Sequence, residues 1–321
     1  QDAARLPAED SVVLENLSRP RKGDDPDQFK IAIPVLDRIA NFDDLDPLRS
    51  QPGVSLSMVR AGEALPDVCD LVILPGSKST ISDLVRFKEN GWDAQLHKHV
   101  KRGGAVLGIC GGYQMLGRSV ADPNGIEGPI KSIEGLGLLD VDTVLEPEKT
   151  VRNTNAVSAR FQAPISGYEI HLGQTLGEDR ERPFSLIDGR PEGAVHRSGR
   201  IMGTYLHGLF SEDAFRQSFL ESLGYMGVGH NYRADVEAVH LRDALGGHAE
   251  DAPLVRLDAP VLLVRPECFA APSDEVERPV EVLACQPAVG PGGADFGEEG
   301  VGLEPAAERA RDHVLAQHIE R

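Results

Sequence analysis

The sequence predicts an α/β fold, with a mostly parallel sheet covered by helices on both faces and an antiparallel extension of that sheet. First, short apolar runs alternate with stretches of helical spacing over residues 30–116. Second, the runs that follow residue 135 are partly alternating, as in antiparallel strands with one solvated face. Third, hydrophobic residues make up 40% of the 321 residues and charged residues 26%, which suits a globular core.

The first half of the chain supplies the parallel part of the sheet. We expect strands at 30–36, 54–59, 71–74 and 105–109, and helices at 83–89 and 93–102, with Ser82 as the cap of the first helix. Residues 41–48 predict a short helix or turn between the first two strands. Because Pro34 has no N–H, the first strand should end early or lie at an edge.

The second half predicts the antiparallel extension. Strands are expected at 135–145, 157–161 and 165–172, and a hairpin at 194–197 and 201–207 that ends on a histidine. A helix should follow over 211–220, with Ser211 as its N-cap and acidic residues in its first turn.

Composition divides the chain into three parts. Residues 1–29 are polar and rich in proline and charge, which is typical of a linker that follows a preceding unit. Residues 30–246 form the folded domain. Residues 247–321 carry 15 acidic and 6 basic residues, half of the net charge of −18, so we expect a disordered acidic tail there.

Several classes of function are disfavoured. A net charge of −18 argues against nucleic-acid binding, which needs a basic surface. No apolar run approaches the roughly 20 residues of a membrane span, and the first residues do not form a signal peptide. There is no metal-ligand cluster and no dinucleotide fingerprint. The cysteines are scattered, which favours a reducing cytoplasm over a disulfide framework or zinc site; they are Cys69, Cys110, Cys268 and Cys285.

The stretch from Ala105 to Gly117 predicts a nucleophile. A buried strand breaks at Cys110-Gly-Gly and resumes as the first turn of a helix. The free N–H groups of that turn favour negative charge, and hence a thiolate. Gly111 lets a backbone amide approach a substrate oxyanion. The alternative is a structural cysteine buried before a glycine-rich turn.

A cysteine nucleophile needs a base, and two histidines qualify. His207 ends an apolar strand and opens into a glycine. His171 lies on the same face of a strand as Glu169, because side chains alternate along a strand. We favour His207 and keep His171 open.

A second turn follows the strand at 71–74. Gly76-Ser-Lys-Ser-Thr lacks the first glycine that a phosphate-binding loop requires, so that interpretation is weak. Since ligands bind at the carboxyl ends of parallel strands, this turn and the Cys110 turn can share one crevice.

Together these motifs resemble class I glutamine amidotransferase domains, which have a flavodoxin-like fold. Within that class they are similar to the cobyric acid synthase family of the cobalamin pathway, over residues 6–246. The resemblance rests on a set of motifs that is more specific than any one of them: Leu74-Pro-Gly-Ser-Lys-Ser-Thr80, Gly108-Ile-Cys-Gly-Gly-Tyr-Gln114, Tyr168-Glu-Ile-His171 and Gly203-Thr-Tyr-Leu-His-Gly-Leu-Phe210.

The resemblance implies a mechanism. Cys110 would attack the amide of glutamine and form a thioester, amides of Gly76 and Gly111 would hold the oxyanion, and His207 would move protons. Ammonia would pass to an N-terminal synthetase domain, absent here, that carries ATP, Mg²⁺ and the corrinoid. There it would amidate the b, d, e and g carboxylates of adenosylcobyrinic acid a,c-diamide. No cofactor is expected in this chain, whose own substrate would be glutamine.

One departure and several alternatives remain. Most class I domains have a glutamate two residues after the histidine, where this chain has Leu209. The cobyric acid synthase branch also lacks that glutamate, so the residue that orients the histidine is open, with Glu169 a candidate and His171 beside it. Alternatives are a related subunit that acts on cobyrinic acid or a cell-wall lipid precursor, another hydrolase of the same architecture, and a silent scaffold domain.

Overall fold

A computed structural model describes residues 28–236. Except for residues 28 and 29, the predicted linker at 1–29 lies outside that range, as do the predicted tail at 247–321 and the last ten residues of the predicted domain. No helix in the described part is long and apolar enough to cross a bilayer.

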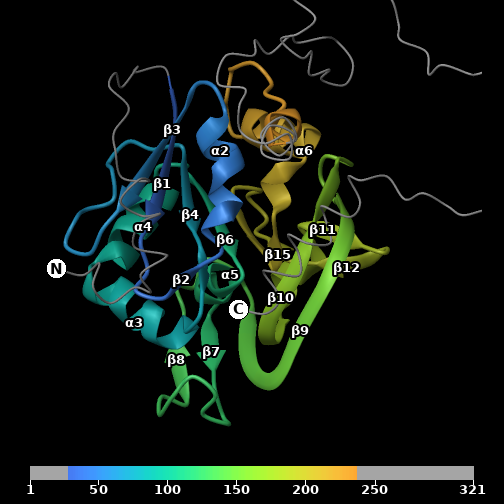
Figure 1. Ribbon diagram of the computed structural model, residues 1–321. Coiled ribbons are helices and arrows are strands. Elements are labelled where there is room, and N and C mark those ends of the chain that lie inside the picture. The colour runs from blue at the N-terminus through green and yellow to red at the C-terminus, as the bar shows by residue number, and fades with distance from the viewer. Residues whose placement is uncertain (1–27, 237–321) are drawn as a thin grey trace, which may run out of the picture. The chain divides into compact units, whose positions relative to one another are not determined.

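A six-stranded sheet forms the centre of the domain, in the order β13-β14-β6-β4-β1-β3 (Figure 1). Its strands are β1 (Phe29–Pro34), β3 (Val54–Val59), β4 (Leu71–Leu74), β6 (Ala105–Ile109), β13 (Ala194–Val195) and β14 (Ile201–Thr204). All neighbours run parallel except β13, which pairs antiparallel with β14. The expected parallel strands are confirmed. Pro34 ends β1, but β1 is an interior strand rather than an edge strand.

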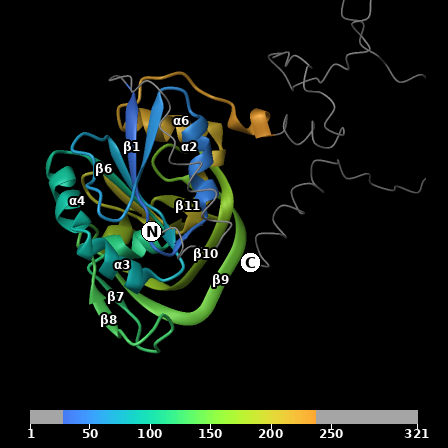
Figure 2. The same ribbon diagram turned by 60° about the vertical axis from the view of Figure 1, so that its left-hand side comes forward.

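Helices cover both faces of this sheet, as predicted (Figures 1 and 2). Leucine and aromatic residues of α3 (Thr80–Glu89), α4 (Trp92–Lys101) and α5 (Gly111–Leu116) pack in one hydrophobic cluster. Those of α2 (Asp46–Ser50) and α6 (Asp213–Ser222) pack in the other. Side-chain alternation divides the strands between the clusters, because Ile31 and Ile33 enter one and Ala32 the other.

The antiparallel strands form a sheet of their own, which corrects the expected extension. Only β13 extends the central sheet. The second sheet has the order β12-β11-β9-β10-β15, with β7 and β8 beside it. Its strands are β7 (Ser119–Ala121), β8 (Ser132–Glu134), β9 (Asp142–Ser158), β10 (Pro164–Leu176), β11 (Ser185–Ile187), β12 (Arg190–Glu192) and β15 (Leu206–His207).

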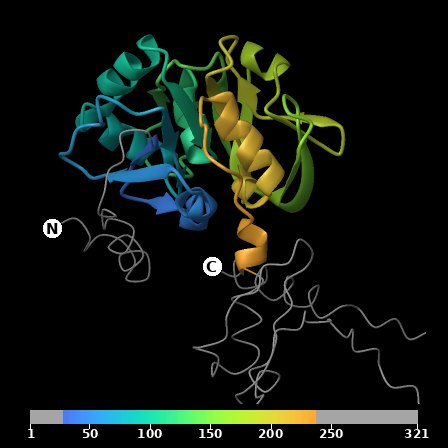
Figure 3. The same ribbon diagram turned by 90° about the horizontal axis from the view of Figure 1, so that it is seen from above.

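Helix α6 lies between the central sheet and the second sheet (Figure 3). Its aromatic residues belong to a hydrophobic cluster that contains residues of both sheets. Phe215 contacts Phe161 beyond β9 and Phe184 before β11, at ring-centroid distances of 6.2 and 6.0 Å. The helix begins at Asp213 after Glu212, so Ser211 is not its N-cap; Ser211 closes a 3₁₀ turn, η4 (Leu209–Ser211). Likewise, α3 begins after Ser79 rather than Ser82. Both errors are shifts of two to three residues at helix ends.

The short elements near the sheet edge matter for the site. A two-stranded ribbon pairs β2 (Ile39–Ala40) with β5 (Gly76–Ser77). After β2 comes a 3₁₀ turn, η2 (Phe42–Leu45), and another, η3 (Glu178–Glu181), follows β10. The expected helix or turn at 41–48 is therefore η2 followed by α2.

Candidate active site

Cys110 sits on a strained turn between β6 and α5. Its backbone has φ 52° and ψ −110°, a conformation that costs a non-glycine residue of the order of 1–3 kcal/mol. Gly112 allows this turn, because a Cβ there would collide with the carbonyl of Leu74 at the end of β4. The strained backbone places the thiol at the carboxyl edge of the central sheet, as the sequence predicted.

The thiol lies against β10. Cys110 Sγ donates to the carbonyl oxygen of Ile170 at 3.2 Å. One turn along α5, Gln114 donates to the carbonyl of Leu172 at 2.9 Å and accepts from the Thr80 hydroxyl at 2.8 Å. The second sheet is thereby fixed against the nucleophile turn.

His207 reaches the same place from β15 and is completely buried. Its Nδ1 lies 2.7 Å from Oδ2 of Asp44, a carboxylate in η2 that is itself 3% exposed. Burial by itself would lower the pKa of His207, but the charge and hydrogen bond of Asp44, together with an interaction with Cys110, raise it from 6.5 to about 10. The imidazole is therefore hydrogen-bonded and coupled to the thiol.

The turn after β4 closes the third side of the site. A Cβ on Gly76 would lie 3.3 Å from Cε1 of His207, and one on Gly111 would lie 3.0 Å from the amide nitrogen of Ser77. The structure thus brings together Cys110, His207, Gly76 and Gly111 from two β-to-helix turns and a distant strand.

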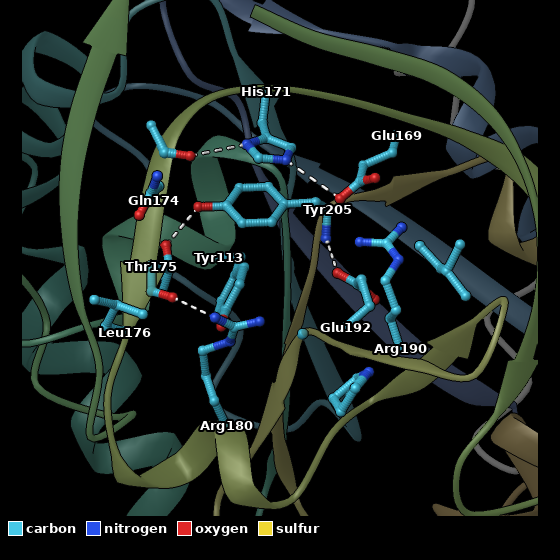
Figure 4. Close-up of a pocket in the computed structure, with 14 residues that line it drawn as sticks. Tyr113, Glu169, His171, Gln174, Thr175, Leu176, Arg180, Arg190, Glu192 and Tyr205 are labelled. Atoms are coloured by element: carbon cyan, nitrogen blue, oxygen red, sulfur yellow. Dashed lines mark hydrogen bonds and ion pairs between the residues drawn. The ribbon is translucent and has the colours of Figure 1, made fainter. Parts of the chain in front are cut away.

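Glu169 and His171 share one face of β10, as alternation predicts, and line a cavity of about 200 Å³ (Figure 4). His171 Nε2 lies 3.3 Å from Oε1 of Glu169, and its ring stacks on Tyr205 at 3.9 Å. The other carboxylate oxygen of Glu169 lies 3.5 Å from Arg152. Glu169 is therefore engaged with His171 and Arg152, and the carboxylate that contacts His207 is that of Asp44.

Sequence reasoning missed Asp44 and Tyr168. Tyr168 lies one position before Glu169, so it faces the other way, and its ring stacks on His207 at a centroid distance of 5.2 Å and an angle of 19°. Because side chains alternate along a strand, the sequence could have placed Tyr168 on the face opposite to Glu169. Asp44 lies in a run of acidic residues 163 positions before His207, and no local pattern connects the two.

A thiol, a buried imidazole and glycine amides at one sheet edge can perform acyl transfer through a covalent cysteine intermediate. Residues 28–236 contain no group of three histidine, cysteine or acidic side chains placed to hold an ion. The parallel sheet with this cysteine turn and strand-end histidine has the fold of class I glutamine amidotransferases.

Comparison with known families identifies the branch. The model of the CobB/CobQ-like glutamine amidotransferase domain matches residues 30–215. The match covers more than half of the chain, and the chain therefore belongs to this family.

Several curated relatives are cobyric acid synthases. A cobyric acid synthase of Rhizobium rhizogenes is 61% identical over 235 residues, 73% of this chain and 48% of that protein. A cobyric acid synthase of Brucella abortus is 57% identical over 247 residues, 77% of this chain and 49% of that protein. The chain spans about half the length of the curated relatives it matches.

Solved structures align more distantly. PurLQS from Thermotoga maritima matches with a TM-score of 0.48 and 19% identity, over 61% of this chain and 99% of that one. A glutamine amidotransferase of the same organism matches with a TM-score of 0.39 and 15% identity, over 68% of this chain and 88% of that one. At these scores the alignments add nothing to the strand order and the family match.

Proposed function

We propose that this chain is the glutaminase part of a cobyric acid synthase, and that it releases ammonia from glutamine through a Cys110 thioester. The observation that carries the proposal is the convergence of Cys110, His207 and the Gly76 turn in a member of this amidotransferase family. The relatives' shared name supports the particular pathway.

The first half-reaction uses the cysteine as nucleophile. Cys110 transfers its thiol proton to Nε2 of His207, and its Sγ attacks the side-chain carbonyl carbon of glutamine. The tetrahedral oxyanion accepts hydrogen bonds from amides of the Gly76 and Gly111 turns. When the C–N bond breaks, Nε2 of His207 protonates the leaving nitrogen, so that ammonia departs and a γ-glutamyl thioester remains.

The second half-reaction reverses the role of the imidazole. Nε2 of His207, now unprotonated, takes a proton from water, and the resulting hydroxide attacks the thioester carbonyl. The C–S bond breaks, glutamate leaves and the thiol is restored. The two steps consume one glutamine and one water, and yield glutamate and ammonia.

The remaining assignments of this proposal concern the rest of the enzyme. Ammonia would amidate the b, d, e and g carboxylates of adenosylcobyrinic acid a,c-diamide on an ATP- and Mg²⁺-dependent synthetase part, in the cytoplasm. The support is that the relatives are about twice as long as this match. A related substrate, cobyrinic acid or a cell-wall lipid precursor, is the second candidate, and only an assay with the synthetase part separates them.

An electrophilic glutamine analogue, 6-diazo-5-oxo-L-norleucine, tests the half-site. The purified chain is treated at pH 7.5 and the adduct is mapped by mass spectrometry, with Cys110→Ala as the matched control. Cys69 is an internal control, because burial raises the pKa of its thiol to about 11 and keeps it protonated.

We expect modification at Cys110 that glutamine suppresses, and none at Cys69. Glutamate release in a coupled assay should disappear in Cys110→Ala and His207→Ala. Equal labelling of both cysteines, unaffected by glutamine, would contradict the proposal and favour a silent scaffold domain.

A further inference from the structure

A carboxylate far from His207 in the sequence forms a short, buried hydrogen bond with it. Asp44 Oδ2 lies 2.7 Å from Nδ1 of His207, and Oδ1 accepts the backbone N–H of Gly208 at 2.5 Å. One carboxylate therefore fixes both the imidazole and the residue that follows it. Such a two-point hold restricts rotation of the ring as well as movement of β15.

We propose that Asp44 is the positioning residue for His207 in glutamine hydrolysis. The proposal deepens the proposed function and rests on it. It assigns to η2, near the beginning of the domain, the task that a glutamate two residues after the histidine performs in most domains of this class.

The hydrogen bond defines which nitrogen of His207 does chemistry. With Oδ2 of Asp44 as the acceptor of this hydrogen bond, Nδ1 of His207 carries the proton between them. In the neutral imidazole, Nε2 is then the unprotonated nitrogen that can act as a base. The interaction of His207 with Cys110 falls to that nitrogen, because Asp44 occupies the other.

The two other positions considered for a carboxylate that orients His207, residues 209 and 169, do not provide one. Leu209, two residues after the histidine, is a buried apolar side chain in η4. Glu169 is paired with His171 and Arg152. Among residues 28–236, no carboxylate other than Asp44 forms an ion pair with His207.

Neighbouring groups hold the faces of the ring. Nδ2 of Asn41 lies 3.2 Å from both ring nitrogens of His207, and an in-plane atom at that position would collide with Cε1 between them. The Asn41 amide thus lies over a face of the ring rather than in its plane. The Tyr168 ring also stacks on the imidazole. Asn41 directly precedes η2, and β2, which ends at Ala40, pairs with the Gly76 strand. The segment that carries Asp44 is therefore joined to the other side of the site.

Two substitutions separate positioning from folding. Asp44→Asn keeps the shape but lacks the charge, and Asp44→Ala leaves space for a small carboxylate. Asp46→Asn is the matched control, two residues along, where the side chain does not contact His207. We expect kcat for glutamine hydrolysis to fall about 10²- to 10⁴-fold in both Asp44 variants, with KM changed less than about threefold.

Formate gives a readout that a purely structural residue would not move. It should restore part of kcat in Asp44→Ala, less in Asp44→Asn, and nothing in Asp46→Asn. The pH profile of kcat should also shift in Asp44→Asn, because burial lowers the pKa of His207 and only the interaction with Cys110 then opposes it. Variants with wild-type kcat and pH profile would refute the positioning role.

A measurement on the unmodified chain keeps this proposal separable from the proposed function. Nitrogen NMR of labelled His207 should show a protonated Nδ1 across neutral pH, and Asp44→Asn should shift that resonance. If the wild-type chain gives this spectrum but has no glutaminase activity, the result counts against the proposed function and not against the contact between Asp44 and His207. An unprotonated Nδ1 in the wild type would overturn the role of Asp44.

Discussion

Replacing Asp44 by Asn should destabilise the domain in a manner that depends on pH. Asp44 and His207 are 3% and 0% exposed, and their contact is 2.7 Å. Removing one partner of such a buried pair typically costs about 3–5 kcal/mol, because the other is left without compensation. Here His207 can lose its proton, so we expect the lower part of that range, about 3 kcal/mol at pH 6.

The direction of the pH dependence follows from the pKa of His207. Since folding raises this pKa from 6.5 to about 10, the pair contributes its full stabilisation below pH 6.5. That contribution is lost as the pH rises through the folded-state pKa of about 10, above which His207 is neutral in both proteins. The gap between wild type and Asp44→Asn should therefore shrink from about 3 kcal/mol to about 1 kcal/mol, the net value of a neutral hydrogen bond.

Trp92 makes the measurement straightforward. It is the one tryptophan of the chain and 1% exposed, so its fluorescence reports unfolding of this domain. Urea unfolding at pH 6, 8 and 10 would be recorded for Asp44→Asn, His207→Gln and the double variant, which isolates the coupling free energy. A coupling that is the same at all three pH values would refute the charged-pair reasoning.

Three further results are expected from the packing around the site. Gly112→Ala should destabilise the domain by more than about 3 kcal/mol and abolish labelling of Cys110, because the new Cβ meets the Leu74 carbonyl; urea unfolding and mass spectrometry check this, and a folded, labelled variant would count against the strained turn. Tyr113→Phe should stabilise the domain by about 1 kcal/mol, since the buried Tyr113 hydroxyl has no hydrogen-bond partner within residues 28–236; thermal unfolding decides, and a loss of stability would show that the hydroxyl is satisfied. Asp83→Asn should flatten stability between pH 4 and 6: burial raises the pKa of Asp83 to about 6, so the wild type gains stability as the pH falls through this window and the variant does not. Parallel curves for the two proteins in that window would show that Asp83 is not desolvated.

Local patterns were sufficient for the central sheet and poor for the second one. Apolar runs such as 71–74 and 105–109 are buried on both faces, so composition alone marks them as strands. The 17-residue strand β9 mixes exposed valines with charged residues, and its pattern located only parts of it. Its bounds follow from pairing with β10 over nearly its whole length, which is a non-local interaction.

The candidate site shows the same division. Cys110, Gly76 and Gly111 follow buried strands directly, so strand ends and glycine spacing were enough to predict that they converge. His207 was favoured over His171 for the same reason, although both remained possible from the residues alone. In the structure His171 pairs with Glu169 and stacks on Tyr205, whereas His207 contacts Asp44.

What the sequence determined by itself is the chemistry at the strand ends, because a nucleophile turn is a local arrangement of a cysteine, glycines and the first turn of a helix. What only the tertiary structure decided is which carboxylate meets His207. Asp44 and His207 are 163 residues apart, and their contact depends on how η2 folds back over the edge of the sheet. Local sequence preferences cannot predict a contact between residues so far apart in the chain. The buried pair forms because folding places both groups where water cannot solvate them, so each must satisfy the other.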